Sequence, residues 1–110
     1  MEVDQIKPAI AAARQQASQA TQAFLDQYGD ADCCGYAWVK VHDVKLSTKV
    51  GKAFAAAGFS KAYGGGIEFW NPSGSSTQSL TAKEKGADAF VKELRARFPD
   101  IKAYSGSRMD

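Results

Sequence analysis

The chain has 110 residues, of which 45% are hydrophobic and 24% are charged, and this composition is ordinary for one globular domain that buries a core. Its net charge of +2 is too small and too scattered to indicate a nucleic-acid-binding protein by its electric field alone. No apolar run approaches the length of a membrane-spanning helix, and no basic segment followed by an apolar one opens the chain, so we expect neither membrane insertion nor secretion.

Apolar and small residues recur at spacings of three and four near the start of the chain. They are Val3, Ile6, Ile10, Ala13, Ala17, Ala20 and Phe24. This spacing predicts an amphipathic helix over about residues 5–28, with Asp4 as its N-cap and Gly29 as its stop. Such a helix is roughly 36 Å long at 1.5 Å per residue, so we expect part of it to pack across a sheet or against a second subunit.

The segment 33–42 has the alternation of a strand, and its two faces differ. Ala37, Val39 and Val41 form one face, whose small aliphatic side chains suit helices packed on a sheet. The other face carries Cys34, Tyr36, Trp38, Lys40 and His42. This aromatic and basic row indicates that the second face meets a ligand, a partner or a covering helix.

A short helix and a hairpin follow. Ser47 is the expected N-cap of the helix, and Gly58 is its expected end. Residues 59–63 and 67–70 are predicted strands. The three glycines at 64–66 between them permit the positive φ of a tight hairpin.

A loop, a helix and a short strand complete the chain. The composition of residues 71–79 is that of a loop, and Thr81 with Glu84 forms a capping box that opens the helix. The expected buried face of that helix carries Ala87, Phe90, Val91, Leu94 and Phe98. Residues 101–104 are a predicted last strand, and residues 106–110 are a predicted tail.

The order of elements after the first helix is strand, helix, strand, strand, helix, strand. This βαββαβ order predicts an α+β fold with an antiparallel sheet of the ferredoxin-like, split βαβ type, in which both helices cover one face. The long N-terminal helix, residues 1–29, is an addition to the α+β core of residues 30–105. No repeat or linker divides the sequence, so we expect a single domain over residues 1–110.

Four segments together carry a resemblance to a known group of proteins. They are CGYAWV at 34–39, GGIEFWNPSG at 65–74, AKEKGA at 82–87 and AYSGSRMD at 103–110. At these segments the chain resembles small proteins of no assigned function that tailed bacteriophages encode. The similarity runs from about residue 32 to residue 110. It implies a phage origin and action in the cytoplasm of the infected host, and it implies no activity.

The aromatic row is the first candidate site. In the ferredoxin-like arrangement the first and third strands are central neighbours, so Tyr36 and Trp38 lie beside either Phe69 or Glu68 and Trp70. RNA-recognition modules stack bases on such residues, although their octapeptide signature is absent here. The alternatives are that the Ala-rich seam of the first helix covers the rings, or that two subunits pair through them. These alternatives are favoured, because two exposed tryptophans are an apolar liability on a monomer.

The loop before the last helix is the second candidate site. Backbone N–H groups of Asn71, Ser73, Gly74 and Ser75, next to a helix N-terminus, suit an anion, and Arg108 from the tail can bind it with two parallel hydrogen bonds. The spacing of a P-loop is absent. A plain connection and a disordered tail are the alternative, which is favoured because Ser/Gly runs are commonly loops.

The only two cysteines, Cys33 and Cys34, are adjacent, which rules out a disulfide framework and favours a reducing compartment. With the only histidine, His42, they lack the spacing of a zinc site. Cys34 and His42 are eight residues apart, roughly 26 Å on a straight strand, which argues against a nucleophile and base. We therefore predict no metal, no cofactor and no catalytic residue, and we expect Cys34 to be a small, partly buried residue.

We expect a homo-oligomeric, non-enzymatic binding or host-modulating protein in the host cytoplasm, with a nucleotide, nucleic acid or host protein as its partner and no membrane partner. A structural or assembly protein whose aromatic face is an oligomer interface is the alternative. An enzyme comes third, because no acid/base pair and no nucleophile with a placed base can be named.

Overall fold

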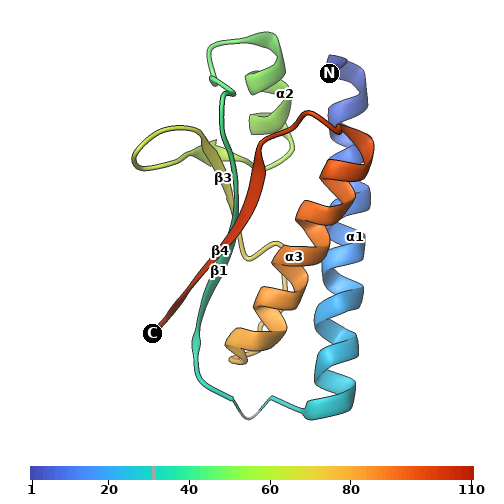
Figure 1. Cartoon of the computed structure of the whole chain (residues 1–110), viewed down its shortest axis with the longest axis vertical. Coiled ribbons are helices and arrows are strands. Elements are labelled where there is room, and N and C mark those ends of the chain that lie inside the picture. The colour runs from blue at the N-terminus through green and yellow to red at the C-terminus, as the bar shows by residue number, and fades with distance from the viewer. Residues whose placement is uncertain (31) are drawn as a thin grey trace.

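The computed structural model describes residues 1–30 and 32–110. The fold is α+β, with a long N-terminal helix and a four-stranded antiparallel sheet, as the sequence predicts (Figure 1). The helices are α1 (Val3–Tyr28), α2 (Lys49–Ala56) and α3 (Leu80–Arg97). The strands are β1 (Gly35–Val41), β2 (Ser60–Lys61), β3 (Ile67–Trp70) and β4 (Ala103–Met109).

The strand order in the sheet is β2-β3-β1-β4, and every neighbouring pair is antiparallel. β1 is therefore flanked by β3 and β4, while β4 and β2 lie at the two edges. In the β1–β3 register, Trp38 is opposite Trp70 and Lys40 is opposite Glu68. Of the two registers that the sequence allowed, the one that places Trp70 beside Trp38 is therefore correct.

The helices lie on one side of the sheet (Figure 1). α3 packs on β1 and β4, and α1 packs along α3 and against α2. The core between these layers contains Val39, Ile10 and a chain of phenylalanines. In that chain the ring centroid of Phe59 lies 5.1 Å from that of Phe54 and 5.2 Å from that of Phe69. The face of β1 that the sequence predicted to be buried is thus the face beneath the helices.

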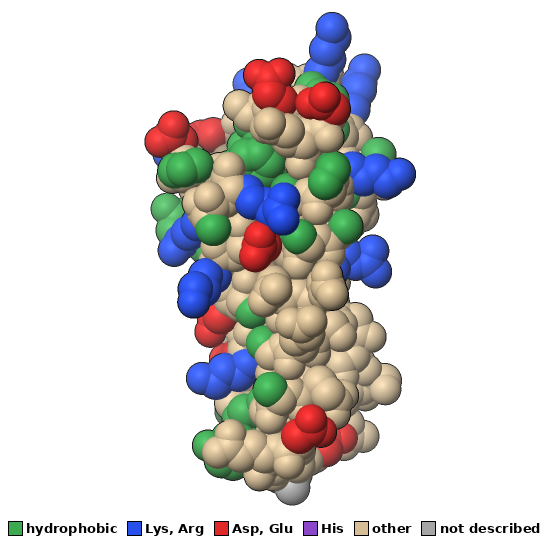
Figure 2. Space-filling view, turned by 90° about the vertical axis from the view of Figure 1, so that its right-hand side faces the viewer, with side chains coloured by type: hydrophobic (Ala, Val, Ile, Leu, Met, Phe, Trp, Pro, Cys, Tyr) green, Lys and Arg blue, Asp and Glu red, His purple; other side chains and the backbone are tan. Residues whose placement is uncertain are grey.

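α1 buries a narrow seam of small and apolar side chains against the other helices. The seam consists of Ile6, Ala9, Ile10, Ala13, Ala17 and Thr21. The side of the molecule that α1 covers carries mixed charges, with hydrophobic side chains only in small separate groups (Figure 2). The expectation that this seam covers the aromatic rings of the sheet is wrong, because α1 lies with α3 and α2 while Tyr36 and Trp70 stay exposed.

The first two helices begin at different residues from those predicted. α1 begins two residues earlier than expected, at Val3 after Glu2, whose side chain makes no capping hydrogen bond, and Asp4 lies within the first turn. The N-cap of α2 is Thr48 and not Ser47, since the Thr48 hydroxyl accepts a hydrogen bond from Gly51 N. Ser and Thr are both favoured N-cap residues, so the sequence alone does not decide between two adjacent ones, and the backbone path does.

α3 begins at Leu80, so the predicted capping box is also wrong. Ser79 is the N-cap, and its hydroxyl accepts a hydrogen bond from Ala82 N at 3.1 Å. Thr81 lies inside the first turn instead, where its N–H donates to Asp32 Oδ2 at 3.1 Å. Glu84 reaches away from the helix start and accepts a hydrogen bond from Ser107. Long-range partners have replaced the local pairing that the sequence suggested.

The predicted tail is a strand. β4 pairs with β1 over its whole length, from Ala103 opposite Val41 to Met109 opposite Gly35. The opposite edge is shorter than predicted, because β2 covers only Ser60–Lys61. The hairpin after β2 has the expected positive φ at all three glycines, with values of 87°, 110° and 76°.

Candidate aromatic face of the sheet

The sheet face that the helices do not cover carries a group of rings and charges from β1, β3 and β4. We call it the aromatic face, and its residues are Tyr36, Trp38, Lys40, Glu68, Trp70, Tyr104 and Arg108. Directly opposed residues on neighbouring strands project to the same face. Tyr36 is 42% exposed and Trp70 and Tyr104 are 50% exposed, so ring surface is open to solvent.

Three of these rings form a contiguous cluster. The centroids of Trp38 and Trp70 are 5.1 Å apart with the planes tilted by 38°, and Tyr36 meets Trp70 edge-on at 6.2 Å. Trp70 Nε1 donates a hydrogen bond to Glu68 Oε1 at 2.8 Å. The polar atom of the Trp70 indole is therefore satisfied by its own strand, and this bond holds the ring while leaving its face free.

Gly106 leaves open the space in which the Trp38 ring lies. It lies opposite Trp38 in β4, and a Cβ at residue 106 would lie 2.6 Å from Cε2 and Nε1 of the indole. That is closer than non-bonded atoms approach, so the ring occupies space that only glycine leaves empty. The sequence reasoning missed this residue, because it placed residue 106 in a tail; the signal was a single glycine between two serines.

Cationic groups surround the rings. Arg108 is opposite Tyr36, and Lys40 lies between Tyr104 and Glu68 on the neighbouring strands. Lys102 Nζ lies 2.7 Å from Asp43 Oδ2 near the end of β1. The hydrogen bond and charge of Lys102 lower the pKa of the Asp43 carboxyl, and Asp43 raises the pKa of Lys102 in return.

The loop proposed as an anion site is folded on itself. Asn71 Nδ2 donates to Ser75 O at 3.0 Å, and Ser75 N donates to Ser73 Oγ at 3.4 Å, while Gly74 takes a positive φ of 67°. Asn71 N is bonded to Ala37 O. Among the described residues, Asn71 Oδ1 is the one buried side-chain oxygen or nitrogen atom that lacks a partner.

The N–H groups at the start of α3 are bonded to carboxylates of the chain itself. Asp30 Oδ1 accepts from Gln78 N at 3.1 Å and from Ser79 N at 3.0 Å, and Asp32 accepts from Thr81 N. The hydroxyl groups of Ser79 and Thr81 lower the pKa of the Asp32 carboxyl. These amides are therefore already occupied by anionic groups, as the positive end of a helix dipole favours.

The structure separates the members of the predicted anion site. Asn71, Ser73, Gly74 and Ser75 follow β3, whereas Arg108 is in β4, and β1 lies between these two strands. It does bring Tyr36, Trp38 and Trp70 together, with Arg108 beside Tyr36. The aromatic face is therefore the better supported of the two candidate sites.

The cysteines are exposed and free, so the expected partial burial of Cys34 is wrong. The Cys34 thiol lies 3.9 Å from Gln78 Oε1. His42 follows the other end of β1, where its ring lies 5.7 Å from that of Tyr104. Within residues 1–30 and 32–110, no group of three or more His, Cys, Asp and Glu side chains is arranged to hold a metal ion.

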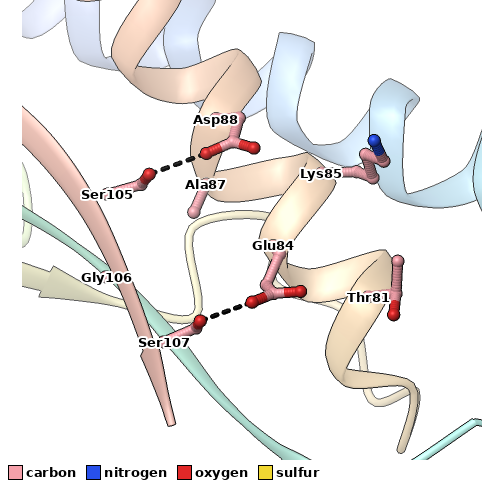
Figure 3. A pocket seen from close by; sticks show the side chains of 8 residues that line it. All are labelled: Thr81, Glu84, Lys85, Ala87, Asp88, Ser105, Gly106 and Ser107. Carbon is pink, nitrogen blue, oxygen red and sulfur yellow. Dashed lines mark hydrogen bonds between the residues drawn. The ribbon is translucent and has the colours of Figure 1, made fainter.

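A groove between α3 and β4 lies outside both predicted sites. It has a volume of about 370 Å³, and Figure 3 shows its lining. Two serines of β4 cross it to reach α3: Ser105 Oγ donates to Asp88 Oδ1 at 2.6 Å, and Ser107 Oγ donates to Glu84 Oε2. The sequence reasoning missed this groove because it gave the last residues no secondary structure.

Comparison of the chain with models of protein families, with curated proteins and with solved structures finds no match. No helix in the described part of the chain combines the length and the apolar character that crossing a membrane requires. Function must therefore be inferred from the geometry of the chain.

Proposed function

We propose that this chain is a small non-enzymatic binding protein that stacks the bases of single-stranded nucleic acid, or of a nucleotide, on its aromatic face. The observation that carries the proposal is the contiguous cluster of Tyr36, Trp38 and Trp70 on a sheet face that no helix covers. Stacking on an aromatic ring is worth roughly 1–3 kcal/mol per base and tolerates any base, because every base has a π face.

The charges around the rings suit a nucleic acid backbone. Arg108 and Lys40 are on the same face as the rings, at positions where each could meet one phosphate. The net charge of +2 predicts weak binding with a small dependence on salt. A base stacked on Trp70 would lie against a ring that Glu68 already orients, so little side-chain entropy is lost on binding.

We also propose that the core is a ferredoxin-like, split βαβ sheet. The support is the strand order β2-β3-β1-β4 with antiparallel neighbours and with two central strands, β1 and β3, that carry the rings. RNA-recognition modules place their base-stacking aromatics on the sheet in the same way. α1 is then an additional helix that lies against the helical layer and leaves the binding face open.

The proposed setting is the cytoplasm of a phage-infected cell. Its support is the resemblance of residues 32–110 to small phage proteins, together with two free, exposed cysteines that a reducing compartment would preserve. In that setting the protein would bind a nucleotide, a single-stranded nucleic acid or a host component, and it would not catalyse a reaction.

The test is binding of a labelled single-stranded oligonucleotide, measured by fluorescence anisotropy at low salt. Trp70→Ala should weaken binding by about 5- to 150-fold, the equivalent of one lost stacking contact. Tyr63→Ala is the matched control, because Tyr63 is fully exposed and lies on the hairpin after β2, outside the aromatic face. Absence of binding by the unaltered chain, or equal loss in both variants, would refute the proposal.

The exposed rings also support a second candidate, an assembly protein that pairs through its aromatic face. A sheet face with exposed Tyr36 and Trp70 rings beside the half-buried Trp38 is the kind of apolar patch that marks protein interfaces. Sedimentation distinguishes the two candidates. If the face is an interface, Trp70→Ala lowers the assembled mass, whereas for a nucleic-acid site it leaves the mass unchanged and weakens the oligonucleotide complex.

A further inference from the structure

The edge of β4 offers unpaired main-chain groups. β4 pairs only with β1, through hydrogen bonds that include His42 N to Lys102 O and Asp110 N to Cys34 O. In an antiparallel ladder hydrogen-bonded residues alternate, so the even-numbered residues of β4 direct N–H and C=O toward β1. The groups of the odd-numbered residues, Ser105, Ser107 and Met109, consequently point out from the sheet.

At one end of this edge, Arg95 binds the main-chain carbonyl that points out from β4. Its Nε and Nη2 donate to Ala103 O at 3.1 and 2.6 Å, and its Cζ lies 5.1 Å from the centre of the Tyr104 ring. The outward carbonyl of Ala103 is therefore already used. An added strand has access from Ser105 onward, and at its far end it would meet the guanidinium of Arg95.

The groove beside this edge carries both signs of charge. Glu84 and Asp88 are bonded to Ser107 and Ser105, and Lys85 also lines the groove, with its side chain on the side of α3 away from the two serines (Figure 3). A groove lined by charges of one sign would suit a partner of the opposite charge. A surface that carries a cation beside two carboxylates can instead complement itself when a two-fold axis brings two copies together.

We propose that β4 pairs antiparallel with β4 of a second copy of this chain, about a two-fold axis at Ser107. Ser107 then lies opposite Ser107 and Ser105 opposite Met109, so each free N–H and C=O of these residues finds a partner. Ala103 stays outside the new ladder and keeps its bonds to Arg95. This interface continues the sheet beyond β4, whose Tyr104 and Arg108 belong to the aromatic face, but it does not use the ring cluster of Tyr36, Trp38 and Trp70 and does not rest on the proposed function.

Charge and apolar surface both favour this register. Asp110 of the second copy comes opposite Tyr104, where the guanidinium of Arg95 lies. The two α3 helices run antiparallel where they lie beside Ser107, at the level of Glu84, which brings Lys85 of each copy toward Glu84 of the other. Met109, which is 64% exposed in the single chain, becomes covered as it pairs with Ser105.

The neighbouring register fits less well. With Ser105 opposite Ser105, residue 107 of the second copy would need the carbonyl of Ala103, which Arg95 occupies. The same register places Lys102 opposite Arg108, and like charges directly opposed on two strands are destabilising.

Disulfide trapping tests the register. In a chain with Cys33→Ser and Cys34→Ser, Ser107→Cys should give a cross-linked dimer under mild oxidation, because hydrogen-bonded antiparallel pairs have Cα atoms about 5.5 Å apart. Ser105→Cys is the matched control. Its two copies would lie roughly 13 Å apart along the strands, beyond the reach of a disulfide. Equal cross-linking of both variants, or of neither, overturns the proposal.

Sedimentation equilibrium tests the interface itself. The unaltered chain should be a dimer at micromolar concentration. Lys85→Glu, at an exposed position, should raise the dimer dissociation constant roughly tenfold, because two like-charge contacts replace two attractive ones. Adding Glu84→Lys should restore it, and Trp70→Ala should leave it unchanged. A chain that stays monomeric at 100-fold higher concentration, or a dimer insensitive to Lys85→Glu, contradicts the proposal.

Discussion

Gly106 lies directly opposite Trp38, and the indole of Trp38 fills the space that a side chain at residue 106 would need. The relationship links the edge strand β4 to the ring cluster of the central strands. The position of Trp38 relative to Trp70, at 5.1 Å between centroids, therefore depends on a glycine two strands away from Trp70.

Gly106→Ala should displace the Trp38 ring and destabilise the fold by about 1 kcal/mol, at the low end of overpacking costs because the half-buried ring has room to move. Urea unfolding measures the stability, and near-UV circular dichroism should report the altered Trp38–Trp70 pair. The control is the same substitution in a Trp38→Ala chain, where the added methyl meets no ring and the cost should vanish. An equal cost in both backgrounds would contradict the steric origin.

The second prediction concerns the stability of a variant at Gly86, where α1 and α3 are in close contact. A Cβ there would lie 2.5 Å from Thr21 Oγ1 and 3.2 Å from Ala17 O, and Thr21 Oγ1 donates to Ala82 O at 2.7 Å. Gly86→Ala should cost about 1–2 kcal/mol, since overpacking of 1–3 kcal/mol is partly offset by the better helix propensity of alanine. Urea unfolding should also show that Gly86→Ala costs less in a Thr21→Ala chain. A stabilised Gly86→Ala protein would refute the close approach of the helices.

The alternation of β1 predicted much of the fold, because a period of two is a local property of the chain. It identified Val39 and Val41 as buried and Tyr36 and Trp38 as the opposite face, and both statements hold. It did not decide whether Trp70 or Phe69 joins that face. The pairing register decides that, and register is set by packing between segments distant in sequence.

The predicted last strand, residues 101–104, overlaps β4 only at Ala103 and Tyr104, and the rest of β4 was missed for a physical reason. Ser105, Gly106 and Ser107 show no apolar alternation, because the serines face α3 and bond to Asp88 and Glu84, which are 17 and 23 residues earlier. A strand whose side chains are satisfied by hydrogen bonds carries no hydrophobic signal in its own sequence. The groove and the free edge became visible only once the strand was placed.

The hydrogen bonds at the start of α3 predict that the stability of the fold depends on pH. Asp32 accepts a hydrogen bond from Thr81 N, and the hydroxyls of Ser79 and Thr81 lower the pKa of its carboxyl below the ordinary 3.8. The ionised carboxylate therefore stabilises the fold. This contribution is complete above the pKa of the unfolded chain and is lost as the pH falls through the pKa of the folded chain. Asp32→Asn should therefore lower the melting temperature at pH 6, and this difference from the unaltered chain should shrink as the pH falls.

Thr81→Val provides the control for that pH dependence. It removes one hydroxyl while keeping the N–H of residue 81, so the pKa of the Asp32 carboxyl should rise toward its ordinary value in an NMR titration. A melting-temperature difference between Asp32→Asn and the unaltered chain that stays constant from pH 6 to pH 2 would show that the carboxylate charge has no part in holding this helix start.

The salt dependence of oligonucleotide binding gives the last prediction. If Lys40 and Arg108 each neutralise one phosphate beside the rings, the logarithm of the binding constant should fall with the logarithm of salt concentration at a slope of about −1.4, near −0.7 for each phosphate of a single strand. Arg108→Gln should reduce the slope to about −0.7. Lys52→Gln, on α2 and outside the aromatic face, should leave it unchanged. A slope steeper than about −4, or one equally sensitive to both variants, would place the phosphate contacts elsewhere on the molecule.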